Sequence, residues 1–103
     1  MAKQRFDLTA IIYDKRGKVL SIGKNSYVKT HPLQYTHACA VGLPEKKFLH
    51  AEIHAIALCK QLSRAHRIVV MRFDKEGEPL NAEPCPVCCS AIRAAGIKIV
   101  EHT

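Results

Sequence analysis

HAEIHAIALCKQL, residues 50–62, carries apolar residues at helical spacing and predicts a helix from His50 to Leu62. The inward face of this helix is expected to hold Ile53, Ile56, Ala57 and either Cys59 or the stem of Lys60. IVVMRF, residues 68–73, is short and β-branched and predicts a buried strand within His66 to Phe73.

EPCPVCCSAIRAAG, residues 83–96, predicts a second helix from Cys85 to Ala95 that ends at Gly96. A short strand from Ile97 to Glu101 should follow. A strand, a helix and another strand in succession favour a right-handed parallel crossover, so this half of the chain predicts α/β structure.

The N-terminal half predicts a β-hairpin and a further helix. Apolar segments at Phe6 to Tyr13 and Val19 to Gly23 flank the turn sequence DKRGK and should pair. Residues 25–49 are too many for a bare connection, and Leu33 to Val41 can form a short helix that Gly42 ends. We therefore expect an α/β fold with a mixed central sheet of about four strands and helices.

Length and composition limit the possible classes of protein. The 103 residues, 48% hydrophobic, fit a single domain spanning residues 1–103. We find no apolar run long enough to cross a membrane and no secretory signal, so a soluble cytoplasmic protein is expected. A formal charge of +7 would attract phosphate-bearing partners, but it equally suits a protein kept soluble by its charge.

The cysteines indicate a metal site rather than disulfides. Their number, five, is odd, and three of them lie within residues 85–89. Cys85 and Cys88 are spaced i, i+3 at the start of a predicted helix, which puts both sulfurs on one face, and His50 begins the other helix. Two thiolates and an imidazole would leave the fourth position of a tetrahedral Zn²⁺ open, as catalytic zinc sites require.

Glu52 stands two residues after His50, where a carboxylate can lie beside the metal without binding it and can move protons. The combination of HxE with PCxxC about 30 residues later resembles the cytidine and deoxycytidylate deaminase superfamily. The resemblance implies that His50, Cys85 and Cys88 bind zinc, with Glu52 as general acid and base. It also implies that Asn25 and the backbone of Ala51 contact the substrate.

The chain would be a member of minimal length. Only five residues precede the first expected strand, and the fifth strand and last helix usual in the superfamily are not expected. One face of the sheet would then lack its cover and one edge would be open, so we expect a homo-oligomer.

Several further residues allow two interpretations. His54 could be an additional metal ligand or a hydrogen-bonded histidine, and Cys89 a core residue or a ligand. HAEIH does not have the HExxH order of metalloproteases. Cys39 and Cys59 are expected to be buried. Residues that could touch a substrate or its phosphate, or could simply be solvated, are His31, Tyr35, His37, Lys24, Lys29, Lys46 and Lys47.

The function expected from these features is zinc-dependent hydrolytic deamination of a free cytosine nucleoside or nucleotide, similar to deoxycytidylate. One alternative is deamination of a base within single-stranded DNA or RNA, and an adenine or guanine base also remains open. Another alternative is a non-catalytic, zinc-stabilised interaction module, in which His54 or Cys89 completes four ligands.

Overall fold

The structure, a computed structural model, describes residues 8–25, 31–43 and 50–103. Some expectations fall elsewhere: the start of the first strand at Phe6 and the roles suggested for Lys29, Lys46 and Lys47 lie outside the described residues.

Four strands form one mixed sheet in the order β2-β1-β3-β4. These are β1 (Leu8–Tyr13), β2 (Val19–Lys24), β3 (Arg67–Arg72) and β4 (Ile99–His102). The strand β1 pairs antiparallel with both β2 and β3, whereas β3 and β4 are parallel. This arrangement confirms the expected hairpin and the α/β class. It also confirms that the two strands in the second half of the chain are parallel.

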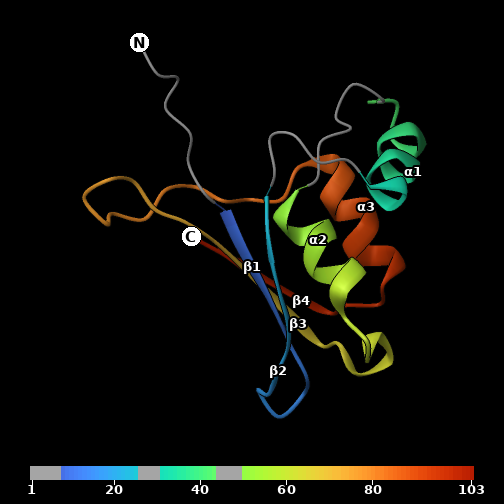
Figure 1. Ribbon diagram of the computed structural model, residues 1–103, viewed down its shortest axis with the longest axis horizontal. Coiled ribbons are helices and arrows are strands. Elements are labelled where there is room, and N and C mark those ends of the chain that lie inside the picture. Colours follow the sequence, from blue (N-terminus) through green and yellow to red (C-terminus); the bar gives the residue numbers. More distant parts are fainter. Residues whose placement is uncertain (1–7, 26–30, 44–49) are drawn as a thin grey trace.

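Three α-helices, α1 (Pro32–Ala40), α2 (Ala51–Leu58) and α3 (Pro86–Ala94), lie on one side of the sheet (Figure 1). Alternate residues of the two central strands face them and are fully buried, among them Ala10, Ile12, Ile68 and Val70. Burial at every second position is the pattern of a sheet covered on one face. None of the described helices has the length and apolar character needed to cross a bilayer.

The helix expected from His50 to Leu62 is shorter in the structure. It ends at Leu58, and Cys59 takes an extended conformation before the short 3₁₀ helix η1 (Leu62–Arg64). Ala55, rather than Ala57, faces the sheet, and Ala57 is exposed, so its expected inward position is wrong.

The last strand begins later than expected. Gly96, at φ 77°, ends α3, and the next amide, that of Ile97, donates to the carbonyl of Ile92. Ile97 is therefore buried beneath the helix instead of joining the sheet. Pairing with β3 starts at Ile99, and β4 runs on to His102.

The helix α2 approaches β2 through a glycine. A Cβ added to Gly23 would overlap the carbonyl oxygen of Ala51 and the amide nitrogen of Ala55. The hydroxyl of Ser21, on the same face, donates to the carbonyl of Ala55 at 2.8 Å. Because no side chain separates the helix from the strand here, this close contact fixes the distance between the start of α2 and the sheet.

Two turns of the same geometry lie at opposite ends of the sheet. In the turn 14–18, the Asp14 carboxylate accepts from the amides of Arg16 and Lys18, at 2.9 Å each. In the turn 74–78, Asp74 does the same for Glu76 and Glu78. The first turn follows the end of β1, and the second follows the end of the antiparallel strand β3. The two sequences, DKRGK and DKEGE, carry opposite net charge.

Candidate metal centre

Two helix N-termini meet at the candidate metal centre. His50 is the residue that precedes the first turn of α2, and Cys85 has the same position in α3. Neither side chain makes the usual hydrogen bond to its own helix end. The N–H groups and the dipole of a helix N-terminus favour thiolates, so α3 supports the charge that metal binding by Cys85 requires.

The three predicted ligands are brought together. The donor atoms of His50, Cys85 and Cys88 all lie within 4.8 Å of one another. His50 Nδ1 is 3.2 Å from the Sγ of Cys88 and 3.5 Å from the Sγ of Cys85. Tetrahedral zinc, with Zn–N near 2.0 Å and Zn–S near 2.3 Å, separates such N and S ligands by about 3.5 Å. The imidazole and the thiols therefore fit zinc in both kind and spacing.

The two thiols differ in their readiness to lose a proton. Hydrogen bonds from the Cys88 thiol and from His50 lower the pKa of Cys85 to about 3, although partial burial opposes the shift. The same contact with Cys85, together with burial, raises the pKa of Cys88. Cys85 is thus the thiolate of the pair, and Cys88 donates to it.

Glu52 lies in the first turn of α2, close to the cysteines, and is only 4% exposed. Burial raises the pKa of its carboxyl, while its own backbone N–H and the Cys88 thiol partly oppose that shift. A raised pKa makes this buried carboxyl easier to protonate than an exposed one, which suits a group that accepts and then releases a proton in acid–base catalysis.

The helix α1 contributes a residue that the sequence did not reveal. Gln34 is fully buried, and its Oε1 accepts the backbone N–H of His50 at 3.2 Å. This bond fixes the residue from which the imidazole projects. A second contact joins α1 to α3, because His37 Nδ1 lies 2.9 Å from the Ser90 hydroxyl.

His54 points to β2 instead of the metal centre. Its Nδ1 lies 3.1 Å from the amide nitrogen and 3.0 Å from the carbonyl oxygen of Lys24. Among the described residues, the group of potential ligands contains neither His54 nor Cys89. The hydrogen-bonded interpretation of His54 therefore agrees with the structure.

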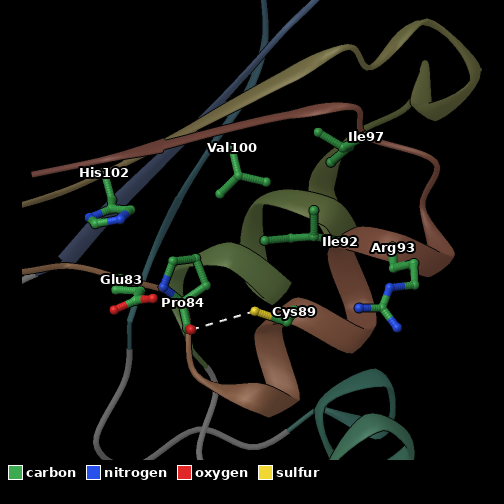
Figure 2. Close-up of a pocket in the computed structure, with 8 residues that line it drawn as sticks. All are labelled: Glu83, Pro84, Cys89, Ile92, Arg93, Ile97, Val100 and His102. Atoms are coloured by element: carbon green, nitrogen blue, oxygen red, sulfur yellow. Dashed lines mark hydrogen bonds between the residues drawn. The ribbon is translucent and has the colours of Figure 1, made fainter.

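Cys89 lines a groove on the far side of α3. The groove, of about 420 Å³, lies between α3 and β4, and none of the three predicted ligands lines it (Figure 2). The Cys89 thiol is directed at the carbonyl of Pro84, 3.5 Å away. Cys89 and Cys39 are both exposed and Cys59 is only half-buried, so the expected core positions of the first two are wrong.

Asn25 and Ala51, expected to contact the substrate, have structural contacts of their own. The Asn25 side-chain oxygen accepts the amide of Leu8 at 2.9 Å, which ties the end of β2 to the start of β1. Ala51 is buried at the first position of α2, against Gly23. His31 Nδ1 accepts the Leu33 amide at the start of α1.

Comparison with known proteins agrees with this geometry. A search among curated proteins gave no match to the chain. The family model for the cytidine and deoxycytidylate deaminase zinc-binding region matches residues 1–102, nearly the whole chain. The match includes both helix starts that bring the imidazole and the two thiols together. This protein, with its candidate zinc ligands His50, Cys85 and Cys88, belongs to the cytidine and deoxycytidylate deaminase zinc-binding family.

Proposed function

We propose that the protein catalyses the hydrolytic deamination of a free cytosine nucleoside or nucleotide, releasing ammonia from C4 of the base. The observation that carries this proposal is the environment of Glu52. Its buried carboxyl, with a raised pKa, lies next to Cys88 and two residues from His50. A closed structural zinc site has no use for such a carboxyl.

The proposed mechanism gives the residues of the centre two roles, zinc binding and proton transfer. His50, Cys85 and Cys88 would hold zinc, which when bound supplies a water of lowered pKa for hydrolysis. Glu52 would accept one proton from that water and deliver it to the ring nitrogen of the base, then take the second proton from the same oxygen, now bound to C4, and pass it to the departing amine, which leaves as ammonia. Because Glu52 is nearly excluded from solvent, its proton passes to the substrate in preference to bulk water.

Substrate contacts are proposed at two positions beside the centre. The side-chain oxygen of Asn25 accepts the Leu8 amide. The side-chain nitrogen of Asn25 carries two N–H donors that can reach a sugar hydroxyl. The first N–H groups of a helix have no partner within that helix, so the amide of Ala51 is suited to an acceptor on the base.

A panel of substrates tests the proposal. Zinc content and ammonia release should be measured for deoxycytidylate, cytidine, cytosine, adenine and guanine compounds, and a single-stranded oligonucleotide containing cytosine. Turnover of a free cytosine compound by the zinc-loaded protein is expected. Turnover of the oligonucleotide alone would instead support a deaminase that acts on nucleic acid. Turnover of an adenine or guanine compound alone would show that the substrate is a purine and not cytosine.

The catalytic role of Glu52 is tested by Glu52→Gln. The variant should keep its zinc and lose at least about 100-fold in activity, since acid–base catalysis contributes a factor of that order or more. Glu83→Gln, at an exposed carboxylate of the neighbouring loop, is the matched control and should retain activity. Zinc binding by the wild-type protein without turnover of any compound would favour the interaction module.

A further inference from the structure

A second cavity lies at the end of the sheet opposite the metal centre. It has a volume of about 610 Å³ and is bounded by the turn 14–18, by η1 and by the connection from α3 to β4. The metal centre lies near the other end, where the backbone of Lys24 meets α2. The six residues of β1 at about 3.3 Å each separate the two ends by roughly 20 Å.

The lining of this cavity is strongly basic. Five cationic side chains contribute to it, together with one histidine: Lys15, Arg16, Lys18, Arg64, Lys98 and His66. The lysines and arginines come from three separate segments of the chain, so the fold, and not a local charge run alone, assembles the cluster. All five are exposed at the surface.

One carboxylate lines the cavity, that of Asp14, and the positive charges of Arg64 and Lys18 act on it. The Oδ1 of Asp14 accepts the backbone amides of Arg16 and Lys18 within its own turn. Within residues 8–25, 31–43 and 50–103, an ion pair joins Arg67 to Glu101 on the sheet. None of the five cations of the cavity takes part in it. With five cations against this one carboxylate, the lining keeps a net positive charge that an outside partner can neutralise.

Four acidic residues of the described part of the chain lie toward the opposite end of the sheet. Asp74, Glu76 and Glu78 belong to the turn 74–78, and Glu83 follows in the same connection. Among the described residues, the basic cavity and this acidic turn are therefore separated along the strands. A cluster of one sign in a concave surface concentrates the field and attracts counter-charges.

We propose that this cavity binds the phosphate backbone of a nucleic-acid strand, independently of the metal centre. Ammonium and guanidinium groups together are the usual partners of phosphate oxygens. Among the described residues, no Phe, Tyr or Trp lines the cavity, and the apolar side chain in its lining is that of Ala65. The site therefore lacks a platform for stacking a base or an apolar group that would enter a membrane.

A strand is favoured over a single nucleotide for the same reason. Without base contacts, a mononucleotide would be held only through its phosphate, whereas a strand places several phosphates along five cations and adds their contributions. Binding should be insensitive to base sequence and strongly dependent on salt. The inference does not rest on the proposed deaminase activity, since its readout is binding.

The test compares two double charge reversals in the zinc-loaded protein. Lys15→Glu with Arg16→Glu removes two cations from the cavity. Lys60→Glu with Lys75→Glu changes the total charge equally at exposed positions outside its lining. Fluorescence anisotropy with a labelled single-stranded oligodeoxynucleotide of random sequence, over a salt series, gives Kd and its salt slope. Circular dichroism checks that each variant is folded.

The cavity variant should bind at least about tenfold more weakly and lose about 0.7 from the salt slope for each phosphate contact removed. The matched variant should lose much less. Equal weakening of both variants would overturn the proposal, because net charge alone would then explain binding. Absence of wild-type binding at low salt would overturn it too, as would displacement of the strand by an equal phosphate concentration of a mononucleotide.

Discussion

Gly23 in β2 lies directly against the backbone of Ala55 in α2, leaving no room for even a methyl group between strand and helix. Gly23→Ala should push α2 away and shift His50 and Glu52 with it. Overpacking of this kind costs about 1–3 kcal/mol, and each kcal/mol lowers Tm by about 4–8 °C in a domain of this size. Thermal unfolding and zinc content of the purified variant measure both effects.

Gly42→Ala provides the control. Gly42 has φ 75° with open space around its Cα, so alanine there costs about 1–2 kcal/mol of backbone strain without touching α2. This variant should lose a similar amount of stability and keep its zinc and activity. If both glycine variants kept full zinc occupancy and activity, the close contact at Gly23 would have no bearing on the site.

Neighbouring cysteines should respond differently to substitution. Cys88 is buried in the candidate centre, whereas Cys89 is exposed and contacts Pro84. Cys88→Ser should abolish stoichiometric zinc, measured by elemental analysis, and Cys89→Ser should retain it. Zinc retained by the Cys88 variant and lost by the Cys89 variant would require a different set of ligands.

Removal of the metal should destabilise the fold. The candidate ligands join α2 and α3, and a ligand that binds the native state stabilises it by mass action. A strong chelator should therefore lower Tm of the wild-type protein and leave that of Cys88→Ser almost unchanged. An identical Tm with and without chelator would show that zinc does not couple the two helices.

The turn 14–18 should make stability depend on acid pH. Backbone hydrogen bonds, that of Lys18 foremost, lower the pKa of Asp14 below its ordinary value of 3.8. A depressed folded-state pKa stabilises the protein above 3.8, and this contribution is lost as the pH falls through the lower folded value. The advantage of wild type over Asp14→Asn should therefore shrink below about pH 4. Chemical denaturation across this range measures it, and a constant difference would contradict the assignment.

Self-association remains a prediction. The described helices cover one face of the sheet, and Ile22 on β2 is 51% exposed, away from them. If copies of the chain associate through the other face, light scattering should give a multiple of the monomer mass, and Ile22→Lys should reduce it. Lys60→Ala, at an exposed position just after α2 on the helix-covered side, is the control. A wild-type monomer would refute the prediction.

The metal ligands could be predicted because their signal is local. Cys85 and Cys88 lie within one helical turn, and the spacing alone puts their sulfurs on one face. The meeting of this turn with His50, 35 residues away along the chain, followed from the family resemblance and from helix starts read in the sequence. The structure places the Nδ1 and Sγ atoms of that pair 3.5 Å apart.

Other features depend on packing that no local pattern encodes. A glutamine in a short helix is usually solvated, whereas Gln34 is buried where it accepts the His50 amide at the start of α2. Cys39 was expected in the core as a small hydrophobe, yet the rotation of α1 leaves it exposed. The end of α2 at Leu58 is likewise not marked by a glycine or a proline in the sequence. The helix ends there because the chain turns to reach β3.

The turns 14–18 and 74–78 carry opposite net charge and lie beyond opposite ends of the sheet. Because DKRGK follows one end of the sheet and DKEGE the other, these two turns contribute a dipole along the strands, on which an approaching polyanion would exert a torque. The basic end would turn toward the polymer and the opposite end, with the metal centre, toward open solvent. A molecule held on nucleic acid in this way would carry its candidate metal centre on the side away from the polymer.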